Sequence, residues 1–365
     1  MNAREIGVLR FEESYFERIW GGRRLQTLFG KPLPDRAAIG EAWLIADHPL
    51  CESVVLNGPV RGMPLRKLIE GDSAGILGSR ARLTPYGRFP LLLKLIDAED
   101  ILSVQVHPDD AIAARLGEPD AGKTEMWHVL HAKPGSQLYC GLRPDVTRET
   151  LAQAIASETL QPLLTHFKAS EGMTVFVDAG TMHAIDSGLV IAEIQQNSNI
   201  TYRCYDWGRV DGNGKPRDLH IEKSLAATHF GTSHGGPART LTYEQSGAVI
   251  EVLGACRYFA GEALTVRRAF RRDTRRESFH MLMVKRGRIG LSAGNSGVSL
   301  GPGEAALLPG CHVCFDIEGD GEILDFYVPD LTRDIVAPLL KAGYGRDGII
   351  RLGGDPVTSD LAALC

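Results

Sequence analysis

The chain has 365 residues, of which 44% are hydrophobic and 23% are charged, and its formal net charge is −5. This is the composition of an ordinary globular protein, and the length favours two domains over one. Since no basic stripe, no signal peptide in residues 1–13 and no membrane-length apolar run is present, we expect a cytoplasmic protein that binds neither nucleic acid nor membrane.

Short β-like runs dominate the chain, which is punctuated by 41 glycines and 19 prolines. Short strands with frequent turns are typical of barrels and sandwiches. Helical patterning is local, and its best example is residues 148–169, where Thr147 can cap a helix with Glu149 in its first turn. We therefore predict a mainly β protein with a small helical insert at about residues 145–170. The β-like runs of this first part lie at residues 52–56, 90–96, 103–106, 174–177 and 189–194.

From about residue 241 short strands follow one another with little helical pattern between them. Residues 231–240, which are rich in Gly, Ser and Thr, form the expected linker. The sequence therefore predicts a catalytic domain at residues 1–235, a second β-domain at 241–330 and a C-terminal tail at 331–365. Seven widely scattered cysteines, an odd number, argue against a disulfide framework.

Three segments carry side chains that bind metal ions. Gln105 and His107 are two residues apart, a spacing that turns both side chains to one face of a strand. Glu125 follows in the second segment and His183 in the third. One amide, two imidazoles and one carboxylate suit a borderline divalent ion, and zinc fits such ligands best. We expect one zinc ion per chain, with iron, cobalt and manganese as open alternatives.

The spacing around His183 resembles that of the cupin barrels, which carry a motif of Gly, five residues, Pro, any residue, Gly, two residues and His. Gly172, Gly180 and His183 follow this pattern, and only Asp178 departs from it by replacing the proline. The second domain repeats the skeleton with Cys314 at the place of the histidine. Two cupin-like jelly-roll barrels are therefore expected, the second without a metal.

Further segments carry a combined pattern: Trp20-Gly-Gly, Gly40-Glu-Ala-Trp43, Lys94-Leu-Ile-Asp97, and residues 103–110, 122–127 and 195–207. Over roughly residues 10–230 this pattern resembles class I mannose-6-phosphate isomerases of the short bacterial form. The resemblance implies that mannose 6-phosphate and fructose 6-phosphate are interconverted with one zinc ion held by the four side chains above. It also implies that Arg203 is catalytic and that Lys123 lies near the substrate. Asn199 stands where many relatives carry Asp, so the general base stays open.

The reaction moves a proton between C1 and C2 through an enediol, which needs a base and a stabiliser of charge on oxygen. Arg203 suits the stabilising role because its guanidinium is always charged and can fork onto two oxygens. Lys123 is one candidate base, provided that it loses its proton beside the metal, and Glu193 is another. The structural alternatives are phosphate binding for Lys123 and ion pairs for Glu193 and Arg203. Trp20 is a candidate wall for a sugar ring, although tryptophans are more often core.

Two other functions stay open from the sequence. A metal-cupin oxygenase would favour a His-rich iron site, against which Gln105 argues. A non-catalytic sugar-sensing protein would not need Lys123, Glu125, His183 and Arg203 together. An isomerase with a shifted aldose substrate is a third alternative. The expected partner is a small sugar phosphate, and the expected assembly is a monomer or a homodimer.

Overall fold

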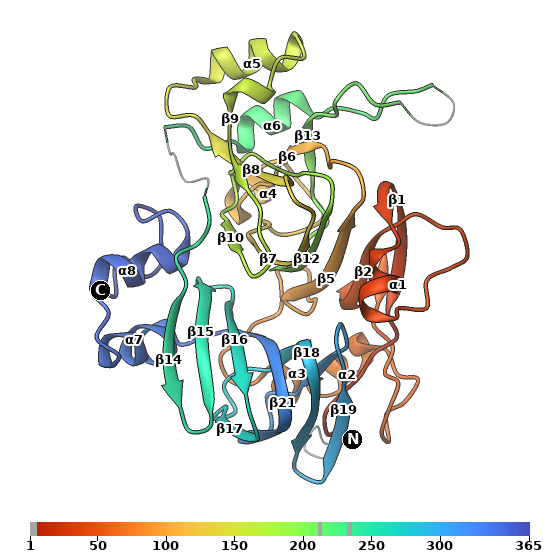
Figure 1. Cartoon of the computed structure of the whole chain (residues 1–365), viewed down its shortest axis with the longest axis vertical. Coiled ribbons are helices and arrows are strands. Elements are labelled where there is room, and N and C mark those ends of the chain that lie inside the picture. Colours follow the sequence, from red (N-terminus) through yellow and green to blue (C-terminus); the bar gives the residue numbers. More distant parts are fainter. Residues whose placement is uncertain (1–5, 211–213, 232–235) are drawn as a thin grey trace. The chain divides into compact units, whose positions relative to one another are not determined.

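The computed structural model describes residues 6–210, 214–231 and 236–365 (Figure 1). The protein is mainly β, with several sheets and short helices, so the predicted fold class is confirmed. Two compact units are formed: Tyr15–Ala42 with Leu95–Pro237, the central unit, and Met1–Ser14, Trp43–Lys94 and Ala238–Cys365, the terminal unit. The predicted domain boundaries stay a prediction, and part of the predicted linker, residues 232–235, lies outside the described residues.

The central unit is built on two sheets, and the chain passes between the units within β2 and within β5. The six-stranded sheet has the order β1-β2-β5-β12-β7-β10, and the five-stranded sheet has the order β13-β6-β11-β8-β9. The strands of the first sheet are β1 (Ser14–Gly22), β2 (Ile39–Ile45), β5 (Leu91–Ala98), β7 (Glu125–Ala132), β10 (Thr174–Val177) and β12 (Leu189–Gln196). Those of the second are β6 (Val104–Val106), β8 (Gln137–Leu142), β9 (Leu164–Lys168), β11 (His183–Ile185) and β13 (Tyr202–Tyr205).

Alternation along the five-stranded sheet gives it two different faces, as the period of two in a strand requires. One face packs in a hydrophobic cluster with residues of the helices α4 (Asp110–Arg115), α5 (Arg148–Ala156) and α6 (Ile221–Ala227) (Figure 1). The residues between these apolar positions face the interior of the unit, where Cys140 of this sheet shares a cluster with Trp127 of the other. The outward apolar residues include Val104, Val106, Met182, Ala184, Tyr202 and Cys204.

The helical insert is shorter than predicted. Thr147 caps α5 through the backbone N–H of Thr150, as expected, but the helix ends at Ala156. Glu158 then takes a left-handed φ of 56°, and Pro162 lies in a 3₁₀ turn that leads into strand β9. The prediction of helix up to residue 169 was therefore wrong, because edge pairing with β8 decides the conformation of residues 164–168.

The terminal unit is built on one eight-stranded sheet, in which β14-β15-β16-β21-β18-β19 are neighbours, β17 pairs with β21, and β20 pairs with β18. Its strands are β14 (Leu241–Gln245), β15 (Ala248–Ala255), β16 (Ala260–Val266), β17 (Ala269–Asp273), β18 (His280–Ala293), β19 (Ser296–Leu300), β20 (Ala305–Leu308) and β21 (Cys314–Tyr327). The segment Trp43–Lys94 adds β3 (Asp47–His48), β4 (Cys51–Glu52), α2 (Leu65–Gly71) and α3 (Ser73–Leu77) to this unit. The helix α1 (Arg24–Phe29) belongs to the central unit.

The C-terminal segment is folded onto this sheet. It forms a π-helix at Leu331–Val336, which continues into α7 (Ala337–Lys341), and then α8 (Arg346–Ile350) and a 3₁₀ turn at Arg351–Gly353. Its apolar side chains share a buried cluster with residues of β14 and β15. All seven cysteines are free, as predicted. Among the described residues, every helix is too short or too polar to span a lipid bilayer.

Candidate metal centre

Three neighbouring strands bring polar side chains into one row of the five-stranded sheet. Arg203 in β13 pairs with Gln105 in β6, and Gln105 pairs with His183 in β11. Cross-strand partners project from the same face of a sheet. Since the flanking residues of each strand pack outward, the row faces the interior of the central unit. Residues almost 100 positions apart in the sequence thus meet at one place.

The predicted metal ligands converge beside this row. The ligand atoms of His107, Glu125 and His183 lie within 4.8 Å of one another, and all three side chains are buried. His107 Nε2 lies 3.2 Å from one carboxylate oxygen of Glu125, and His183 Nε2 lies 3.7 Å from the other. The amide of Gln105 lies 3.2 Å from His183 Nε2, and a flip of that amide exchanges its nitrogen for its oxygen. The four side chains can therefore surround one ion.

The protonation of the cluster fits metal binding. Burial and then the charge of Lys123 lower the pKa of His107 to about 3, so its imidazole is neutral. His183 Nδ1 donates to the carbonyl of Thr181 at 2.8 Å, so Nε2 is the unprotonated nitrogen of the neutral ring and can act as a ligand. Burial raises the pKa of Glu125, but Lys123 and the histidines outweigh it and hold that pKa well below its usual value.

One oxygen of Glu125 gives an independent indication of a cation. Among the described residues, Glu125 Oε2 is buried and accepts no hydrogen bond. A buried carboxylate oxygen without a partner is costly, and natural proteins rarely leave one unless an ion or water satisfies it. The donor set of two imidazoles, one carboxylate and one amide is also the kind that zinc and related ions prefer. The residues present therefore fit a bound divalent ion.

Lys123 lies beside the cluster. Its Nζ is 2.7 Å from Glu125 Oε1 and 3.2 Å from His107 Nε2. Lys123 is 4% exposed, so the charge of its ammonium acts on these neighbours with little screening by water. This position allows Lys123 to contact a ligand held at the same place, either as a charge or as a proton carrier.

The backbone on both sides of Lys123 is fixed by two side chains that the sequence did not single out. The N–H of Gly122 donates to Asp110 Oδ1 at 2.8 Å, and the N–H of Thr124 donates to Gln196 Oε1 at 3.0 Å. Gln196 Nε2 in turn donates to the same Asp110 oxygen at 3.1 Å. The two side chains form a clamp, the Asp110–Gln196 clamp, around the segment that carries Lys123. The only sequence signal was their place within the segments 103–110 and 195–207.

The guanidinium of Arg203 contacts two neighbouring residues. Nη1 donates to the carbonyl of Asp218 at 2.9 Å, and Nε lies 3.4 Å from Ser103 Oγ. The neighbouring carboxylate of Asp206 forms ion pairs with Arg209 and Arg217. Burial and the charge of Arg217 lower the pKa of Arg203, and an arginine nevertheless stays charged at neutral pH.

The two other predicted substrate residues lie among aromatic side chains. Glu193 in β12 pairs with Trp127 in β7, and its Oε2 accepts the indole N–H of Trp127 at 3.1 Å. The Trp127 ring in turn lies edge-on to His183, with 5.3 Å between ring centroids. Trp20 is 5% exposed and belongs to the hydrophobic cluster of Trp127. Asn199 is exposed, and its backbone N–H donates to Asp120.

The chain was compared with known proteins. Residues 8–134 match the family described as phosphomannose isomerase type I, catalytic domain. A mannose-6-phosphate isomerase of Streptococcus mutans is 34% identical over 316 residues, which are 87% of this chain and 96% of the relative. The crystal structure of the mannose 6-phosphate isomerase from Bacillus subtilis superposes with a TM-score of 0.79 at 31% identity, covering 88% of this chain and 99% of the other. This chain therefore belongs to the type I phosphomannose isomerase family.

Proposed function

We propose that this enzyme interconverts mannose 6-phosphate and fructose 6-phosphate, and that Gln105, His107, Glu125 and His183 hold its metal ion. The observation that carries the proposal is the buried convergence of these side chains beside Arg203 and Lys123. Membership of the isomerase family supports the reaction. Zinc as the native ion, a cytoplasmic location and a monomeric or homodimeric state are expectations that accompany the proposal.

A bound divalent ion would supply Lewis-acid polarisation of substrate oxygens. The guanidinium of Arg203, which projects from the same face as Gln105, would stabilise negative charge that develops on a substrate oxygen. Such preorganised charge in a dry site is usually the largest contribution to the rate. Arg203 suits this role because it keeps its proton while the substrate gains and loses one.

The proton between C1 and C2 needs a carrier, and two residues remain candidates. Lys123 is supported by its contacts with Glu125 and His107. Glu193 in β12 is supported by the hydrogen bond that it accepts from the indole N–H of Trp127. This bond orients one of its carboxylate oxygens. A positioned base contributes roughly 10²–10⁴-fold in rate, so the two single variants Lys123→Met and Glu193→Gln distinguish the candidates.

A coupled isomerase assay on mannose 6-phosphate tests the proposal directly. The protein is assayed as purified, after chelation, and after zinc is added back, and bound metal is quantified in each sample. We expect activity to disappear on chelation and to return with zinc. A folded, zinc-loaded protein without activity would contradict the proposal and favour a shifted substrate or a sugar-binding role. Oxygen consumption in the same samples would favour the oxygenase alternative.

A further inference from the structure

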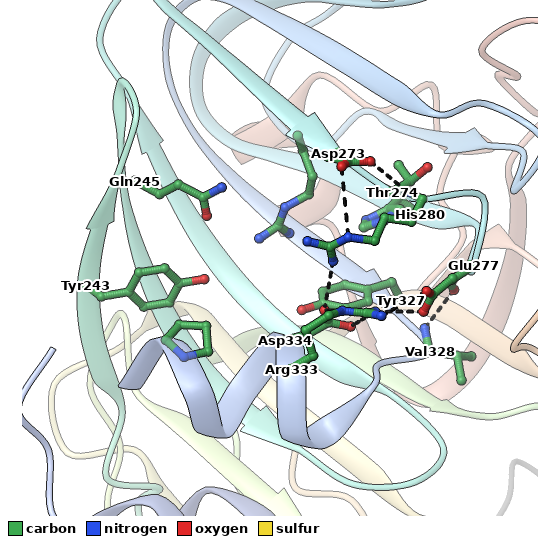
Figure 2. Close-up of a pocket in the computed structure, with 14 residues that line it drawn as sticks. Tyr243, Gln245, Asp273, Thr274, Glu277, His280, Tyr327, Val328, Arg333 and Asp334 are labelled. Atoms are coloured by element: carbon green, nitrogen blue, oxygen red, sulfur yellow. Dashed lines mark hydrogen bonds and ion pairs between the residues drawn. The ribbon is translucent and has the colours of Figure 1, made fainter. Parts of the chain in front are cut away.

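The terminal unit contains a polar cavity of its own, which the metal centre does not use. Its volume is about 200 Å³, and its lining comes from β14, from the β17–β18 connection, from β18 and β21, and from the π-helix (Figure 2). Tyr243, His280 and Tyr327 supply rings to its wall. Pockets for drug-sized ligands have roughly 300–1,000 Å³, so this cavity suits a small molecule.

The floor of the cavity is a buried network of charges. Arg272 donates to Asp325 at 2.6 Å and also to Glu262. His280 Nδ1 lies 2.9 Å from Asp325, and the hydroxyl of Tyr327 donates to Glu262 at 2.9 Å. All five side chains are buried. Apolar residues of similar volume often stabilise a fold as well as a buried ion network does, so stability alone does not account for this one.

Two irregular backbone segments border the cavity. Arg275 and Arg276 both have left-handed φ angles, 53° and 58°, which are unfavourable for a residue with a Cβ atom. On another side, Arg333 and Asp334 belong to the π-helix. Strained residues and π-helical turns are rare and occur frequently at functional sites. Their meeting at one cavity supports a binding role for it.

The charged side chains that line the cavity include both signs, and several of them are already paired. Three arginines, Arg272, Arg275 and Arg333, stand against three carboxylates, Asp273, Glu277 and Asp334. Arg333 is engaged by Glu277 at 2.6 Å and by Asp334 at 2.9 Å. A phosphate or a carboxylate would therefore have to displace an existing ion pair, which costs desolvated charge. The lining favours a ligand without net charge.

Hydrogen-bonding groups and aromatic surface remain available to such a ligand. The guanidinium of Arg275 lies 3.7 Å from Asp334 and 3.9 Å from Asp273, which is beyond hydrogen-bond distance and leaves donors for a guest. The side chains of Tyr243 and Gln245 project into the same space (Figure 2). A wider hollow of about 600 Å³ shares both of these residues with the cavity.

We propose that this cavity is a second ligand site, which binds a neutral polyol of monosaccharide size. Ring hydroxyls would accept from Arg275 and donate to Asp334, and the apolar face of the sugar would pack on Tyr243. The proposal is separate from the isomerase reaction, because all of its residues lie in the terminal unit.

Saturation-transfer difference NMR on the full chain tests this site. Unphosphorylated D-mannose is used at about 10 mM, a concentration above the Kd of a ligand that binds in the millimolar range. We expect saturation transfer to D-mannose in the wild type and equally in Glu125→Gln, which alters only the metal centre. Tyr243→Ala and Arg275→Gln should weaken binding by about ten-fold each. The matched controls Tyr86→Ala and Arg267→Gln alter an exposed tyrosine and an exposed arginine of the same unit outside the cavity and should bind as the wild type does.

Several results would overturn the proposal. Equal transfer in Tyr243→Ala and in the wild type would do so. Tyr243→Phe, which keeps the ring and should melt at the wild-type temperature, serves as the folded comparison at this position. Loss of transfer in Glu125→Gln would place the sugar at the metal centre instead. Absence of transfer to D-mannose, D-glucose and D-fructose would exclude neutral monosaccharides. Isomerase activity does not enter any of these measurements, so a failure here is distinguishable from a failure of the proposed reaction.

Discussion

Gln196→Ala should release the backbone segment that carries Lys123 while leaving the metal ligands in place. The substitution removes the acceptor of the buried Thr124 N–H and the donor to Asp110. An unsatisfied buried N–H costs about 1–3 kcal/mol, and a hydrogen bond to a carboxylate contributes about 1.5–3 kcal/mol. We therefore expect a local loss of about 2.5–6 kcal/mol, less where water replaces the amide. A protein in the middle of the ordinary range of stability, ~5–15 kcal/mol, stays folded.

The expected consequence is kinetic. If the segment shifts by ~1 Å, the turnover number should fall by about 10²-fold, as it does when a catalytic group is misplaced. Metal content should stay near that of the wild type, because Glu125 is held in β7 by its pairing with Val177 and Gln195. The assay is steady-state kinetics on mannose 6-phosphate, together with metal analysis and a thermal melt on the same samples.

A matched variant separates the clamp from a general loss of packing. Asp110→Asn keeps an oxygen that can accept from both Gly122 and Gln196, so it should retain most of the activity. Asp110→Ala removes that acceptor and should resemble Gln196→Ala. Wild-type turnover in a folded Gln196→Ala protein would refute the reasoning, and so would a loss of bound metal in proportion to the loss of activity.

Three further predictions concern single residues. Glu125→Gln removes the only anionic side chain of the proposed ligand set, so metal analysis after dialysis should find little bound ion and the coupled assay little activity. Arg203→Lys keeps the charge but loses the fork, and kcat should fall by about 10²–10³-fold with a small change in KM; an unchanged kcat would exclude the stabilising role. Hydrogen bonds from Arg333, against the effect of burial, hold the pKa of Glu277 below its usual 4.5. Its stabilisation, about 0.5–1 kcal/mol, is thus present above pH 4.5 and is lost as pH falls through the folded pKa; urea unfolding between pH 3 and 7 should show a shallower acid loss in Glu277→Gln.

The sequence predicted the parts of the site that depend on local pattern. The spacing of Gln105 and His107 predicted that both side chains lie on one face of a strand, and the motif ending at His183 predicted a third ligand. The side chains of these residues do lie close together, and their role as ligands stays a prediction. It did not predict the Asp110–Gln196 clamp, because its hydrogen bonds join residues 86 positions apart and carry no spacing signal.

The sequence also predicted those parts of the fold that depend on local pattern. Alternation and turn residues identified most strands, and Thr147 identified the start of α5. The strand β9 was missed because an edge strand with exposed alternate residues resembles a helix of weak pattern. The pairing of Leu9 with Leu307 was not predicted either, since a bridge between residues so far apart leaves no trace in local composition.

The metal centre depends on the outer face of its sheet as much as on its ligands. Gln105 and Arg203 face inward because Val104, Val106 and Tyr202 pack outward under the helices. A slip of β6 by one residue would turn Gln105 away from the cluster and bury valines in its place, and it would also expose the apolar outer face. The hydrophobic cluster therefore fixes the register that brings the polar row together. Polar substitution at Val106 should lower metal affinity through this register, without touching a ligand.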